Sequence, residues 1–143
     1  MSVSQVQYYK LMEKKFEIEE DIFKKLGELQ DLKKKIADQK KKRAKDQRER
    51  EEHLIKKDEF EADGLTDKAL KSEVASKKKE ASIAQKDYKI RDFERKIAKV
   101  EEEIDQLELE LKEAESDIDR HQSGTPREEP EELEPSVFED NEY

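Results

Sequence analysis

A heptad pattern without proline constrains this chain more than any other feature of its sequence. Apolar residues recur at alternating steps of three and four, and the first proline is Pro126. Proline interrupts helices, whereas the Glu, Lys, Leu, Ala and Gln that fill the first 121 residues favour them. Steps of three and four place one apolar row along a helix, as in a coiled coil. The pattern therefore predicts helix over nearly all of residues 1–121.

The apolar rows that we expect to hold the helices together are called seams. The first seam contains Tyr8, Leu11, Lys15, Ile18, Ile22, Lys25, Leu29, Leu32 and Ile36, and the second contains Phe93, Ile97, Val100, Ile104, Leu107, Leu111, Ala114, Ile118 and His121. Between them, the stretch DQKKKRAKDQREREEH offers no side chain larger than Ala44 to bury, and Leu70, Val74, Ala81, Ala84 and Tyr88 follow a shifted phase. We therefore expect a seam that is strong at both ends, weak in the middle and out of phase there.

The segment EADGLTDKAL, residues 61–70, carries the turn signal of this region. Gly64 suits the left-handed residue that ends a helix, and Thr66 or Asp67 suits the N-cap of the next one. An unbroken rod is the alternative, and it would hold Gly64 inside a helix at a cost of about 1 kcal/mol. We favour the turn, so Gly64 and Thr66 are our predicted turn residues.

Folding the chain at this turn places the apolar stretches of the two seams opposite each other. Leu29 then meets Val100, and Leu32 meets Ile97. We predict an all-α fold, an elongated antiparallel coiled-coil helical hairpin with a helix over about 4–62, a turn at 63–66 and a helix over about 67–121.

Composition separates the helical region from the C-terminal end. Charged residues make up 50% of the chain and hydrophobic ones 31%, which argues against a compact globular core. The final stretch SGTPREEPEELEPSVFEDNEY holds eight acids, one arginine and all three prolines. We therefore predict a hairpin over 1–122 and a disordered acidic tail over 123–143. Val137, Phe138 and Tyr143 form a candidate short binding motif in that tail.

A second apolar stripe runs beside the first seam, displaced by one residue. It contains Tyr9, Met12, Phe16, Glu19, Phe23 and Leu26, and only Glu19 interrupts it. One residue is about 100° around a helix, so a partner helix that covers the seam cannot fully cover this stripe. Tyr9, Met12, Phe16, Phe23 and Leu26 are therefore candidate partner-binding residues, for a second copy in a four-helix bundle or for a different helical protein.

A basic segment, residues 33–45, carries eight basic residues and one acid. The basic residues are Lys33, Lys34, Lys35, Lys40, Lys41, Lys42, Arg43 and Lys45. They could bind nucleic acid, an anionic membrane or an acidic protein tail. The alternative is a solvated face that neighbouring acids such as Glu49, Glu51 and Glu52 balance.

No sequence signal for catalysis or for a bound cofactor is found. The chain has no Gly-rich phosphate loop, nucleophile elbow or HExxH motif, and its two histidines, His53 and His121, lie far apart. The absence of cysteine excludes thiolate metal sites. We predict a protein that is not an enzyme and has no cofactor, metal or small-molecule substrate.

The same features set our expectation for function and location. The chain shows no signal-peptide pattern and no apolar stretch of transmembrane length, so we expect a soluble cytoplasmic or nuclear protein. We expect a structural or adaptor coiled-coil subunit of a multiprotein assembly, with a charged-surface binder as the first alternative. In length and two-helix layout the chain is also similar to the small coiled-coil stalk proteins of flagellar and type III export ATPases. That similarity would imply a stalk role.

Overall fold

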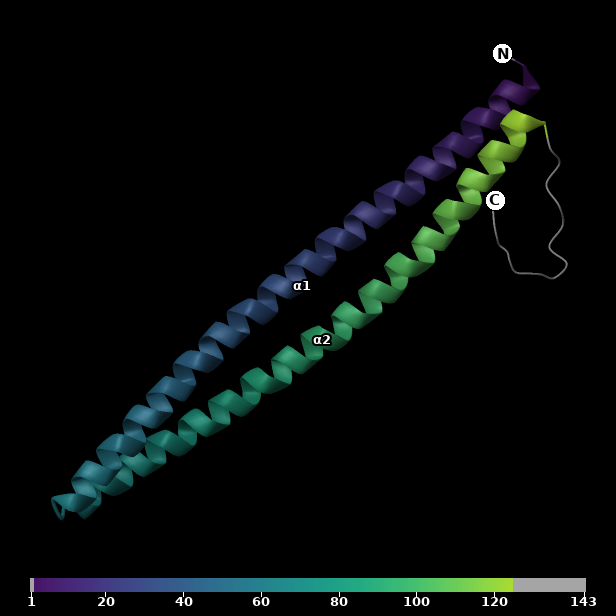
Figure 1. Ribbon diagram of the computed structural model, residues 1–143. Coiled ribbons are helices and arrows are strands. Elements are labelled where there is room, and N and C mark those ends of the chain that lie inside the picture. Colours follow the sequence, from purple (N-terminus) through teal and green to yellow (C-terminus); the bar gives the residue numbers. More distant parts are fainter. Residues whose placement is uncertain (1, 125–143) are drawn as a thin grey trace, which may run out of the picture. The chain divides into compact units, whose positions relative to one another are not determined.

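Two helices account for almost all of residues 2–124, the part of the chain that the computed structural model describes (Figure 1). Helix α1 spans Val3–Ala62, and helix α2 spans Thr66–Ser123. The predicted all-α helical hairpin is confirmed, and the predicted helix bounds agree closely with these. The predicted tail motif of Val137, Phe138 and Tyr143 lies outside the described residues.

The turn between the helices is a Schellman motif built around Gly64. The Leu65 amide donates to the Phe60 carbonyl at 2.8 Å, and the Gly64 amide donates to the Glu61 carbonyl at 3.1 Å. Gly64 has a φ of 73°, in the left-handed region where a side chain strains the backbone. The prediction that Gly64 ends the first helix is therefore confirmed.

The predicted N-cap of α2, Thr66 or Asp67, is wrong by one or two residues. The Leu65 carbonyl accepts the first bond of the new helix, from the Ala69 amide at 3.0 Å, so Leu65 occupies the N-cap position and Thr66 is already helical. The Schellman motif uses the Leu65 amide, and the new helix begins at once from its carbonyl. Asp67 lies in the first turn of α2, where its negative charge interacts favourably with the positive end of the helix dipole.

The described residues form two compact units, and each unit pairs part of α1 with part of α2. The first unit joins residues 2–23 to residues 105–124. Its buried apolar side chains are Ile18, Ala114 and Ile118, all members of the predicted seams. His121, near the C-terminal end of α2, also joins the two helices of this unit, because its Nε2 lies 3.0 Å from the Ser4 carbonyl oxygen.

The second unit is Lys24–Ile104, which includes the turn. Its apolar core contains Leu29, Val100 and Ile104, with Leu32 and Ile97 packed against them. The predicted pairs of Leu29 with Val100 and of Leu32 with Ile97 therefore lie in one cluster. The aliphatic side chains at heptad positions are therefore buried here, as the pattern predicts.

The predicted shift of phase between residues 70 and 88 is wrong. Leu70, Val74 and Tyr88 are 60%, 51% and 61% exposed. The buried residues of this stretch are instead Ala69, Ser72, Ser76 and Ile90, which continue the heptad of the second seam without a break. The seam toward the turn is therefore in phase, but small and polar side chains fill it.

Candidate docking surface

An apolar row on α1 is exposed in the first unit, where the sequence predicts it. This α1 stripe consists of Tyr9, Met12, Phe16, Glu19 and Phe23. Tyr9 is 58% exposed, Phe16 is 54% exposed and Phe23 is 78% exposed, whereas the neighbouring Ile18 of the seam is buried. Since the seam faces α2, a row displaced by about 100° turns toward solvent. The stripe thus presents three aromatic rings to water.

Acidic side chains border the α1 stripe. A shallow surface hollow is lined by Tyr9, Met12 and Phe16 together with Glu13, Glu17 and Glu20. None of these three glutamates forms an ion pair within residues 2–124. Leu26, the last predicted member of the row, belongs to the second unit and is 43% exposed.

The aromatic residues of the first unit divide between its seam and its surface. The Tyr8 ring lies 5.4 Å from the Tyr9 ring, edge to face, and 6.2 Å from the His121 ring. Tyr8 therefore packs toward α2 while Tyr9 turns outward. Edge-to-face contact of this kind restricts the motion of the exposed Tyr9 ring.

A buried polar seam in the second unit is the feature that the sequence reasoning missed. Asp46 is only 7% exposed. It accepts a hydrogen bond from the Ser82 hydroxyl at 2.6 Å, and its carboxylate pairs with Lys86 at 2.8 Å and with Lys79 at 3.7 Å. Lys79 also pairs with Glu49 at 2.8 Å. Counting the heptad onward from Ile36 reaches Asp46, so the position could have been found, but its polar character hid it.

The pKa shifts in the polar seam follow from these contacts. The hydrogen bonds from Lys86 and Ser82 lower the pKa of Asp46 against the opposing effect of burial. The hydrogen bond between Lys79 and Glu49 lowers the pKa of the glutamate and raises that of the lysine. These directions favour the charged forms of Asp46, Glu49 and Lys79, so the seam joins the helices through charge.

The lysines that interrupt the first seam keep their charged ends near solvent. Lys25 pairs across the helices with Glu103 at 3.2 Å, and this hydrogen bond raises its pKa. The Lys15 amine lies 5.8 Å from the centre of the Phe16 ring, beside the α1 stripe.

The basic segment of residues 33–45 lies in the second unit, and most of its lysines are exposed. Arg43 is an exception, because its Nε pairs with Asp87 of α2 at 2.5 Å. Lys42 pairs with Asp38 at 3.1 Å, and the Lys35 amine lies 5.9 Å from the Phe93 ring. Lys33, Lys34, Lys40, Lys41 and Lys45 form no ion pair within residues 2–124.

The acids that were expected to balance the basic segment pair with other residues. Glu49 pairs with Lys79, Glu51 with Arg50 and Glu52 with Arg48. Lys45 is close enough to lower the pKa of Glu49, but it is not the main cause of that shift. The positive charge of the segment is thus largely uncompensated by these neighbours.

A second exposed apolar row lies on α2, where the sequence reasoning had placed part of the seam. This α2 stripe consists of Leu70, Val74, Lys77, Ala81, Ala84 and Tyr88, and all six are exposed. It has the same steps of three and four as the α1 stripe, with a lysine where that stripe has a glutamate. The row was misread as a seam because its aliphatic side chains are larger than the buried alanine and serines beside it.

The described residues hold no group of three or more His, Asp or Glu that could bind a metal ion. Within the same part of the chain, neither helix contains a segment with the length and hydropathy of a membrane span. Comparison of the chain with known protein families, with curated proteins and with solved structures finds no match.

Proposed function

We propose that this chain is a non-enzymatic structural or adaptor subunit that docks helix on helix in a multiprotein assembly. The exposed α1 stripe carries the proposal. Tyr9, Met12, Phe16 and Phe23 make the contact, and Leu26 is a further exposed apolar side chain of the same helix. Aromatic side chains in an exposed row are typical of docking surfaces, because each buries a large apolar area with few rotamers to restrict.

The contact is of the helix-on-helix type because the stripe has heptad spacing. Residues at alternating steps of three and four pack as knobs into the holes of a second helix. The acidic border of Glu13, Glu17 and Glu20 favours a partner helix that carries basic residues beside its apolar row.

Photo-crosslinking tests this proposal directly. Phe23 is replaced by the photoreactive residue benzoylphenylalanine, and the matched control carries it at Asp21. Asp21 is also exposed but lies two residues away, about 200° around the helix. We expect a discrete protein adduct from position 23 in extracts of the source cells, and none from position 21. Phe16→Asp in the same chain should reduce that adduct at least about tenfold. Equal labelling from both positions, or none from position 23, would refute the docking function.

A second candidate function, binding of an anionic polymer or membrane by the basic segment, is favoured by the unpaired lysines described above. Its test is the reversal of Lys33, Lys34, Lys40 and Lys41 to glutamate, with Arg43 left in place because it pairs with Asp87. Binding to labelled duplex DNA or to phosphatidylserine vesicles should be steeply salt-dependent in the unaltered chain and lost in the variant. Binding that survives the reversal would exclude this segment.

A further inference from the structure

We propose that the partner of the α1 stripe is the α2 stripe of a second copy of this chain. The inference rests on the proposed function, because it names what docks on the α1 stripe. Both stripes are exposed helix faces with the same heptad spacing, and they lie in different units of the chain. Contact between copies therefore joins the first unit of one to the second unit of the other.

The apolar members of the two stripes match around one charged position. Glu19 of the α1 stripe is three residues after Phe16 and four before Phe23, whereas Lys77 of the α2 stripe is three after Val74 and four before Ala81. When Glu19 faces Lys77 and the two helices run parallel, Phe16 faces Val74 and Phe23 faces Ala81. Large rings then meet small side chains, which is the arrangement that lets rows of side chains interlock.

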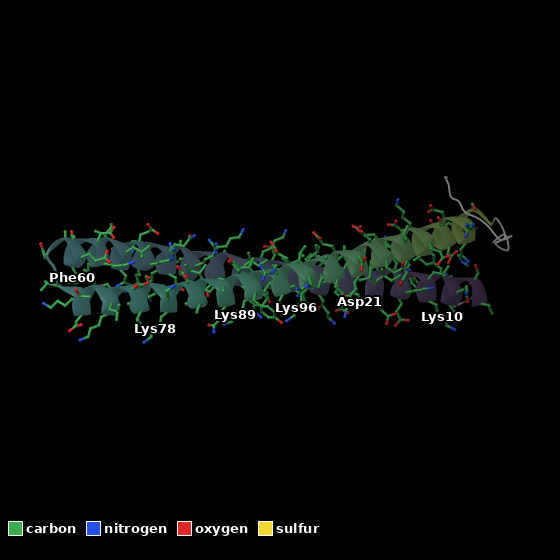
Figure 2. All side chains as sticks on the ribbon, turned by 90° about the horizontal axis from the view of Figure 1, so that it is seen from below. Lys10, Asp21, Phe60, Lys78, Lys89 and Lys96 are labelled. Carbon is green, nitrogen blue, oxygen red and sulfur yellow. The ribbon has the colours of Figure 1, made fainter. Side chains whose placement is uncertain are left out.

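The unpaired acids beside the α1 stripe are opposite in sign to the unpaired lysines beside the α2 stripe, and Lys15 is a basic residue that also lies beside the α1 stripe. The α1 stripe has the unpaired Glu13, Glu17 and Glu20 beside it. The α2 stripe has Lys71 and Lys78 on its outer side, and neither forms an ion pair within the described helices. Figure 2 shows Lys78 and Lys89 projecting from α2 away from α1.

The acids nearest to the α2 stripe do not cancel these lysines. Glu73, Glu80 and Asp87 pair instead with α1, through Lys57, Arg50 and Arg43. The outer face of α2 is thus left with positive charge. Two α1 stripes facing each other would bring glutamates together, whereas an α1 stripe facing an α2 stripe pairs glutamates with lysines. This difference favours contact between unlike stripes over the symmetric contact.

Contact between unlike stripes predicts that two single variants restore each other's association when mixed, which a symmetric contact does not predict. Phe16→Asp disables the α1 stripe and keeps the α2 stripe, whereas Val74→Asp does the reverse. Both positions are more than half exposed, so each variant should keep the circular dichroism spectrum of the full chain. Each variant alone should lose self-association at least about tenfold, and an equimolar mixture should recover a dimer and no larger species.

Sedimentation velocity on the full-length chain and its variants reads out these species. The unaltered chain should form dimers or larger species. A Glu19→Lys or Lys77→Glu change should weaken them, and the chain carrying both changes should recover them. The inference is overturned if the unaltered chain stays monomeric, if Val74→Asp alone still self-associates, or if the mixture stays monomeric. In those cases a position-23 crosslink to a different protein would leave the proposed docking function standing, so the two failures are distinguishable.

Discussion

Replacing Asp46 by alanine removes the carboxylate that holds Lys86, Lys79 and Ser82 between the helices of the second unit. Two short hydrogen bonds are lost, from side chains that are only partly exposed. A hydrogen bond to a charged group contributes about 1.5–3 kcal/mol net, and the lysines recover part of this by reaching water. We expect a loss of roughly 2–3 kcal/mol in the free energy of unfolding and a fall of about 5–10 °C in Tm.

The matched control is Asp92→Ala. Asp92 also pairs with two basic residues, Arg95 at 3.7 Å and Lys96 at 3.3 Å, but its side chain is 41% exposed. Surface pairs along one helix contribute under about 0.5 kcal/mol, so this variant should unfold almost as the unaltered chain does. Urea and thermal unfolding followed by circular dichroism, at two protein concentrations, give both values. Equal losses in the two variants would refute the reasoning.

The pH dependence supplies a second check on Asp46. Its pKa is lowered in the folded chain, so the stability it contributes is complete above its ordinary pKa of 3.8 and is lost as the pH falls through the folded value. The difference in the free energy of unfolding between the Asp46→Ala and Asp92→Ala variants should therefore disappear when the pH falls below that ordinary value. A gap that persists in strong acid would show that the carboxylate charge is not its cause. A double change of Asp46 and Lys86 to leucine should cost little or stabilise the fold, because apolar packing replaces the whole charge pair.

Two paired substitutions test the turn and the seam. Gly64→Ala should destabilise the chain by about 1–2 kcal/mol because of its left-handed φ, whereas Gly27→Ala, in the interior of α1, should stabilise it by about 0.5–1 kcal/mol. An added Cβ meets nothing within 4 Å at either glycine, so only backbone preference separates them, and equal effects in urea titrations would argue against the turn geometry. Leu29→Ala should lose about 2–3 kcal/mol by leaving a cavity, whereas the exposed Leu70→Ala should lose under about 0.5 kcal/mol. The reverse order would show that the seam assignment is wrong.

The parts of the fold that were predictable depend on local chemistry or on large aliphatic side chains. Gly64 marked the turn because few residues other than glycine accept its backbone angles. Leu29, Val100 and Ile104 marked the core because they repeat at heptad spacing. The exposed α1 stripe followed from the same counting, since a row one residue away from a seam must face elsewhere.

Heptad counting reaches the buried positions in the middle of the hairpin, but hydropathy does not mark their side chains as buried, because it ranks each side chain without regard to its partners. Asp46 is buried only because Ser82 and Lys86, far along the chain, satisfy its carboxylate. The choice of Lys79 rather than Lys45 as the main partner of Glu49 likewise depends on the opposite helix. A row such as Leu70 and Val74 therefore looked more like a core than the serines that are actually buried.

Packing in the second unit changes from aliphatic to ionic along the helices, so the free energy needed to separate the helices locally also differs along the unit. Around Leu29 and Val100, separating the helices exposes apolar surface to water, which is costly at any ionic strength. Around Asp46 and Arg43, separation exposes charges that water and salt solvate well. Salt therefore loosens the polar stretch before the apolar one, and its backbone amides become the first of the unit to exchange with solvent. Two helices of uniform appearance thus contain a region whose rigidity depends on the ionic strength of its surroundings.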